Sequence, residues 1–154
     1  MITQQQLDGY LGKPISQICQ NGFAKDSDNH CAHFVAHAMG YGFGVVTCLT
    51  MSHGKHPGAT IRVQEIFPRC QSVGTWASRP QTLTSCLVFI TRASNVNLAT
   101  KVMNNVPRKH IGIYLDGSIW HYSNSQHKVV RQTPQQFATH YPSPDNAMFY
   151  GSLP

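Results

Sequence analysis

The chain has 154 residues, of which 41% are hydrophobic, and its 12 basic and 6 acidic side chains give a formal net charge of +6. This length and composition predict a single domain, residues 1–154, that is large enough to bury its own core. The basic residues are dispersed and no apolar run is long enough for a membrane span, so the composition argues against a sequence-specific nucleic-acid arm and an integral membrane segment.

The amino-terminal half is predicted to be mainly helical. An apolar stripe predicts a helix over residues 3–19, interrupted by a Gly-Lys-Pro stretch. A second helix is expected over residues 30–39, because polar residues can cap its start and Gly40 can end it. Residues 40–60 are glycine-rich and read as irregular, and a short helix is expected over residues 59–67.

The carboxy-terminal half is predicted to form a sheet. The apolar run CLVFIT at residues 86–91 is typical of a buried strand, and a helical turn is expected in the polar connection that follows it. HIGIYL and SIWHYS flank Asp116-Gly117, a strong hairpin signature. The later elements are a strand at 127–133, a short helix at 134–141 and a strand at 146–152. Helices followed by mostly antiparallel strands indicate an α+β fold.

The hairpin predicts that two histidines share one face of the sheet. If Asp116-Gly117 forms a two-residue turn, Leu115 pairs with Ser118, which gives His110 and His121 the same parity. Gly112 then lies between them without a side chain to separate them. The opposite face of the hairpin is apolar and is expected to pack on a helix.

Cys31 is predicted to be a nucleophile at the start of the second helix. A helix amino terminus stabilises a thiolate through its dipole and free N–H groups, so we expect a low thiol pKa. His110 would take the thiol proton and later protonate the leaving amine, and His121 would orient the imidazole of His110. The backbone N–H of Cys31 is a candidate oxyanion donor.

Taken together, HCAHFV, CLVFIT, HIGIYLDGSIWHYS and KVVRQTPQQFATHY resemble the NlpC-type papain-like cysteine peptidases of the bacterial cell wall. The resemblance covers about residues 28–150 and matches Cys31, His110 and His121 to the nucleophile, base and orienting residue. It implies hydrolysis of an amide bond in peptidoglycan stem peptides. Here His-Cys-Ala-His replaces the usual Asp-Cys-Ser-Gly at the nucleophile, and residues 41–86 have no counterpart.

The compact architecture also resembles the amidase effectors that bacteria inject into rival cells. The amino terminus lacks the charged and apolar regions of a secretory signal, so we expect synthesis in the cytoplasm. The effector resemblance then implies export by a non-classical route, action in the periplasm or cell wall, and secretion machinery and an immunity protein as partners. Substrate contacts are expected near the catalytic residues, from His30, His33, Trp120 and Tyr122.

A metal site is the weaker interpretation of the histidine-rich helix. His33 and His37 have a helical spacing that suits zinc, with Cys31 or His30 as a further ligand. However, the general-base glutamate of a metalloprotease motif is absent and the five cysteines form no CxxC pair. We therefore expect no metal and no cofactor, with both histidines on the solvent side of their helix and most thiols buried.

Two other functions remain open from the sequence. The same fold and acyl-enzyme would serve a transpeptidase, an acyltransferase or a deamidase acting on protein, depending on whether water or an amine attacks. Alternatively, the positive charge with exposed aromatic residues would suit a non-catalytic module that binds polyanions or glycans.

Overall fold

A computed structural model of the chain describes all of residues 1–154. Six strands form an antiparallel sheet with the order β1-β8-β2-β5-β6-β7, and two short strands pair separately. The helices are α1 (Gln4–Asp8), α2 (Cys31–Met39), α3 (Cys48–Ser52), α4 (Val63–Ile66) and α5 (Pro134–His140), with 3-10 turns η1 (Ile15–Gln17), η2 (Phe67–Arg69), η3 (Trp76–Ser78) and η4 (Ala93–Asn95). The strands are β1 (Val73–Thr75), β2 (Ser85–Arg92), β3 (Val96–Asn97), β4 (Val102–Met103), β5 (His110–Leu115), β6 (Ser118–Ser123), β7 (Lys128–Gln132) and β8 (Asn146–Gly151).

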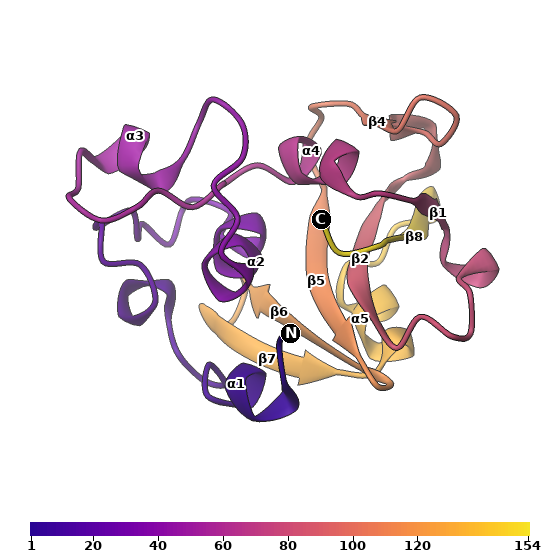
Figure 1. Cartoon of the computed structure of the whole chain (residues 1–154), viewed down its shortest axis with the longest axis horizontal. Helices are drawn as coiled ribbons and strands as arrows, with labels where there is room; N and C mark the ends of the chain where they lie inside the picture. Colours follow the sequence, from indigo (N-terminus) through magenta and orange to yellow (C-terminus); the bar gives the residue numbers. More distant parts are fainter.

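The predicted α+β class with a mostly antiparallel sheet is confirmed. Helix α2 packs on β5 and β6 on one face of the sheet, whereas α5 contacts β6 and β7. Figure 1 shows α1, α2 and α3 gathered on one side of the molecule and α5 behind the sheet. No helix has both the length and the apolar character needed to cross a bilayer.

Two apolar clusters occupy the two faces of the sheet. The larger joins Phe34 and Val35 of α2 to Ile111 and Ile113 of β5. The smaller surrounds Phe137 of α5 and includes residues of β2, β5 and β6. Because successive side chains of a strand point to opposite faces, the odd residues of β5 lie beneath α2 and the even ones face α5.

The hairpin forms in the predicted register. Leu115 pairs with Ser118, and Asp116 and Gly117 both have positive φ angles, 47° and 91°, as a type I′ turn requires. Helix α2 also follows its prediction, since it runs from Cys31 to Met39 and ends at a left-handed Gly40 with φ of 76°.

Other elements differ from the sequence prediction. The expected long first helix is reduced to α1 and η1, because Gly12 has a φ of 77° and the following Pro14 is extended. The predicted helical turn after β2 is wrong, since this connection forms η4 and the small β3–β4 hairpin. Strand β1 and helix α3 were not predicted, because both are short and lack a periodic pattern.

Candidate active site

Cys31 is held at the junction of α2 and the hairpin. It is the first residue of α2, its side chain is buried, and its Sγ lies 3.7 Å from the carbonyl oxygen of Lys109, just before β5. Its backbone N–H donates to Oδ1 of Asn29, which also accepts from Nδ2 of Asn124 in the turn after β6. These contacts fix the start of the helix against the two strands that carry the candidate histidines.

The environment of Cys31 differs from the expected one. Burial raises the pKa of its thiol to about 11, and the lowering effects of the N–H groups of Ile111 and Ala32 and of the Lys109 charge are smaller. The expected low-pKa thiolate is therefore not found. Cys31 is a neutral thiol at pH 7, so it can act as a nucleophile only if a base removes its proton.

His110 and His121 lie on the same face of the hairpin, as their parity predicts, and this face is covered by α5. A Cβ at Gly112 would lie 2.7 Å from Cγ2 of Ile119 and 3.2 Å from Cβ of His121. Glycine therefore allows the close packing between the two strands at this point. Burial lowers the pKa of His110 to about 3 and that of His121 to about 4, so both imidazoles are neutral at pH 7.

The two imidazoles have different partners. The His110 ring stacks on Tyr141, with centroids 3.3 Å apart and planes 9° from parallel. Nε2 of His121 lies 2.7 Å from Oε1 of Gln132; this oxygen can only accept, so Nε2 of His121 carries the proton. Nδ1 of His110 and Nδ1 of His121 are both buried and have no hydrogen-bond partner.

The three predicted catalytic residues are neighbours but are not joined by hydrogen bonds. Cys31 lies on the α2 side of β5, and its sulfur contacts the carbonyl of Lys109, the residue that precedes His110. The expected hydrogen bond between His110 and His121 is absent, since Nδ1 of each ring has no partner and Nε2 of His121 bonds Gln132. The structure thus places the two histidines on one face of the hairpin and the thiol on the α2 side, at the start of β5.

A basic hollow of about 320 Å³ has Cys31 in its lining. The charged side chains around it are those of Arg62, Arg108 and Lys109, and it contains no acidic residue. Asn29 also lines it, and Nδ2 of Asn29 has no protein acceptor, because only its Oδ1 is engaged. The hollow would therefore attract a negatively charged group, and Asn29 adds an amide donor to its lining.

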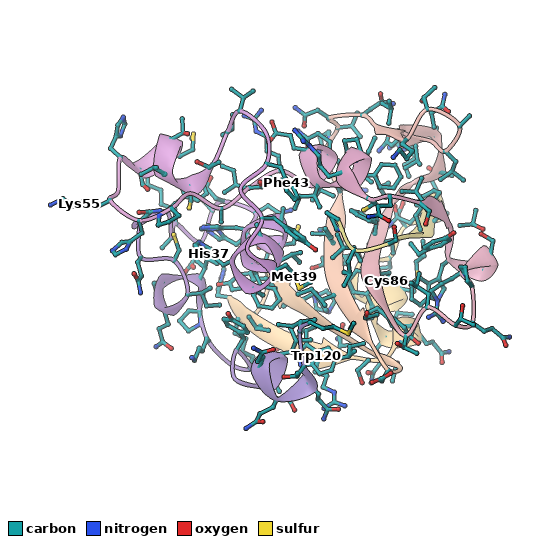
Figure 2. The ribbon with its side chains drawn as sticks, in the orientation of Figure 1. His37, Met39, Phe43, Lys55, Cys86 and Trp120 are labelled. Carbon is teal, nitrogen blue, oxygen red and sulfur yellow. The ribbon has the colours of Figure 1, made fainter.

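The four side chains expected to touch substrate all lie in the interior, with at most 1% of their surface exposed, and none lines this hollow: His30, His33, Trp120 and Tyr122. Trp120 donates from Nε1 to Asp8, and the hydroxyl of Tyr122 accepts from the backbone of Ile15. Figure 2 shows Trp120 between the sheet and α1. Trp120 and Tyr122 hold the amino-terminal segment on the sheet. None of the four side chains is positioned to bind a substrate in this structure.

Several residues of the site were not expected from the sequence. Tyr141 and Gln132 contact the two histidines, and Asn29 lies against Cys31. The only local signal for Asn29 was its position just before the helix, and the other two lie in the predicted strand and helix of residues 127–141, where no local pattern singles out either side chain. No protein-family model, curated protein or solved structure matches the chain.

Proposed function

We propose that this protein is a papain-like, NlpC-type cysteine amidase that hydrolyses an amide bond in peptidoglycan stem peptides through an acyl-enzyme on Cys31. The observation that carries the proposal is the position of Cys31 at the first turn of α2, against the start of β5, in the lining of a basic hollow. Stem peptides carry free carboxylates, which the basic side chains of the hollow would attract.

His110 is the proposed base. Its buried Nδ1 has no hydrogen-bond partner, so it can accept a proton without breaking an existing bond. The imidazole and the thiol are both neutral at pH 7, so the reaction begins with transfer of the thiol proton to His110. Because no hydrogen bond joins the two side chains at rest, the imidazole or the thiol must turn on substrate binding.

The proposed reaction proceeds in two stages. The thiolate of Cys31 attacks the carbonyl carbon and forms a C–S bond, and the amide C–N bond breaks as the amine takes the proton from His110. Water then attacks the thioester, His110 accepts a proton from it, and the proton returns to the sulfur as the acid leaves.

Asn29 supports the oxyanion in this proposal. The backbone N–H of Cys31 donates to Asn29 at 3.0 Å, so it is engaged in the resting state. Nδ2 of Asn29 has no protein acceptor, and Oδ1 of the same amide accepts from the Cys31 backbone, which places this donor in the hollow that Cys31 lines. An amide donor beside the nucleophile would stabilise the negative oxygen of the tetrahedral intermediate.

Digestion of purified peptidoglycan tests the proposal. Mass spectrometry of the soluble products is compared for the wild type, Cys31→Ala and Cys86→Ala, which removes another fully buried thiol on the α5 face. We expect new amine and carboxyl termini from the wild type and Cys86→Ala and none from Cys31→Ala, with circular dichroism showing all three folded. Equal products from Cys31→Ala and the wild type would refute the nucleophile, and no product from any of them would refute the substrate.

A further inference from the structure

A second group of reactive side chains lies on the far side of α2 from the sheet. Cys19 follows η1, His33 and His37 lie one turn apart on α2, and Cys48 begins α3. One ligand atom from each lies within 4.8 Å of every other. Figure 2 shows His37 on the side of α2 that faces the α3 segment. Three segments that are distant in sequence therefore converge on one point.

Two distances within this group are close to those between the ligands of a tetrahedral metal. Nε2 of His33 and Nε2 of His37 are 3.1 Å apart, and Sγ of Cys48 is 3.8 Å from Nε2 of His37. With Zn–N near 2.05 Å and Zn–S near 2.3 Å, the edges of a tetrahedron are about 3.3 Å for N–N and about 3.6 Å for N–S. These two separations depart from the tetrahedral edges by about 0.2 Å, and no pair of ligand atoms in the group is more than 4.8 Å apart.

Hydrogen bonds leave a lone pair on His33 where a metal would need it. Nε2 of His30 is 2.7 Å from the carbonyl of Lys25, which can only accept, so this nitrogen carries the proton. In the tautomer that carries its single proton on Nε2, Nδ1 of His30 is an acceptor, and Nδ1 of His33, 3.0 Å away, donates to it. Nε2 of His33 is therefore unprotonated and faces His37. Metal-binding histidines are commonly oriented by such a bond from their second nitrogen.

The two sulfurs are surrounded by N–H groups. Sγ of Cys48 accepts from the backbone N–H of Ala59 at 3.1 Å and from Nδ2 of Asn21 at 3.5 Å. The backbone N–H groups of Asn21 and Phe23 lie near the sulfur of Cys19, where the chain reverses at Gly22 with φ of 80°. Donors aimed at a buried sulfur compensate the negative charge that a metal-bound thiolate retains.

From this geometry we propose that Cys19, His33, His37 and Cys48 bind a structural zinc ion. Two thiolates balance the charge of Zn²⁺, so the complete site is neutral and suits burial. Sulfur and imidazole ligands without a carboxylate select zinc over magnesium or calcium. All four positions are filled by protein, which is the arrangement of structural and not catalytic zinc. The site differs from the metal interpretation of the sequence, since it uses neither Cys31 nor His30.

The proposed ion would fasten three segments together. It joins the segment after η1 and residues 41–60, which contain α3 and are otherwise irregular, to α2, whose first residue is Cys31. The β-pairing within residues 41–60 consists of one isolated bridge, between Thr47 and Thr60. The ion would add a second link to this segment. A hollow of about 450 Å³ has His37 in its lining and gives the ion a path from solvent. The proposal is independent of the amidase function.

A disulfide between Cys19 and Cys48 is the alternative use of the two thiols. Both are free in the structure, and a disulfide would leave the paired histidine rings without a role. The two cases differ in metal content, in their dependence on His37 and in the mass of the purified chain after alkylation of free thiols.

Metal analysis of the full chain tests the proposal. The protein is purified without chelator under reducing conditions, and zinc is measured by mass spectrometry for the wild type, Cys48→Ala and His37→Gln. Matched controls are Cys86→Ala, another buried thiol, and His56→Gln, an exposed histidine of the same loop. We expect about one zinc per chain in the wild type and both controls, and loss of most of it in the two ligand variants.

Cobalt provides a readout that does not depend on the folding of any variant. Chelator-treated wild type is titrated with Co²⁺ alone, and we expect the visible bands of a tetrahedral ion together with thiolate charge-transfer absorption. Wild type without zinc and without these bands would overturn the proposal. So would unchanged zinc in both Cys48→Ala and His37→Gln, or a Cys19–Cys48 disulfide in the reduced preparation.

Discussion

Two groups of buried histidines, on opposite faces of the sheet, differ in how their nitrogens are used. In the α2 group, both ring nitrogens of His30 and of His33 have partners, and the network ends on a backbone carbonyl. In the hairpin group, Nδ1 of His110 and Nδ1 of His121 are buried without any partner. A saturated network fixes its members in one geometry, whereas an unpaired nitrogen costs stability and is retained where it can take a proton. The comparison supports a structural role for the α2 group and the proposed proton-accepting role for the hairpin group.

The largest effect is expected from removing the metal. A chelator should lower the Tm of the wild type by about 10 °C or more, since loss of a structural metal is among the most destabilising changes in a domain of this size. Cys48→Ala should melt at the temperature of the chelated wild type and should not respond to the chelator. Differential scanning calorimetry measures both, and an identical shift in the wild type and Cys48→Ala would contradict a site that includes Cys48.

The same substitution placed in each group should have opposite consequences. His110→Phe keeps an aromatic ring against Tyr141 and removes an unsatisfied nitrogen, so the Tm should stay within about 2 °C of the wild type or rise. Peptidoglycan hydrolysis should fall by about 10²-fold or more, because the base is lost. His33→Phe removes a proposed zinc ligand and the bond to His30, so the Tm should fall by about 10 °C or more, as on chelation.

Thermal melts and hydrolysis rates of these two variants are read together. A marked loss of stability in His110→Phe with unchanged hydrolysis would reverse the assignment of the two groups.

Gln132 offers a smaller test within the hairpin group. Gln132→Leu removes the acceptor of the proton on Nε2 of His121 and leaves a buried donor unpaired, at a cost of about 1–3 kcal/mol in the free energy of unfolding. Gln132→Glu retains an acceptor and is the matched control. Urea denaturation measures the difference, and equal stability of the Leu and Glu variants would show that the bond contributes nothing.

The pH dependence should be the most gradual effect and carries a definite sign. Burial lowers the pKa of His121 to about 4, whereas the unfolded chain titrates near 6.5. Between these two pH values the unfolded chain binds one proton more than the folded chain. The free energy of unfolding is therefore highest above pH 6.5 and decreases as the pH falls towards 4. Each pH unit in this window costs about 1.4 kcal/mol for one such histidine.

His121→Phe should reduce the slope of the free energy of unfolding against pH by the equivalent of about one proton. Urea denaturation between pH 4.5 and 7 compares the slopes of the variant and the wild type in the presence of chelator. Identical slopes would mean that His121 is not a neutral buried imidazole in the native state.

Local patterns predicted the elements that carry the candidate catalytic residues. The helix expected over residues 30–39, and observed from Cys31 to Met39, followed from its apolar residues and from Gly40, and the hairpin register followed from Asp116-Gly117. These signals act within a few residues, so no knowledge of the rest of the chain is needed. The placement of His33 and His37 on the solvent side was wrong, because His33 is fully buried and His37 half-buried beneath the segments that carry Cys19 and Cys48.

By itself the sequence determined a helix that begins close to Cys31, the shared face of His110 and His121, and the α+β class, because periodicity and turn chemistry decide these features locally. Only the tertiary structure decided what surrounds each side chain. It buried the thiol of Cys31 and raised its pKa, stacked Tyr141 on His110, and brought Cys19 and Cys48 to the two histidines of α2. Hydration, hydrogen bonding and ligand geometry depend on neighbours that are tens of residues away in the chain, and no local pattern encodes them.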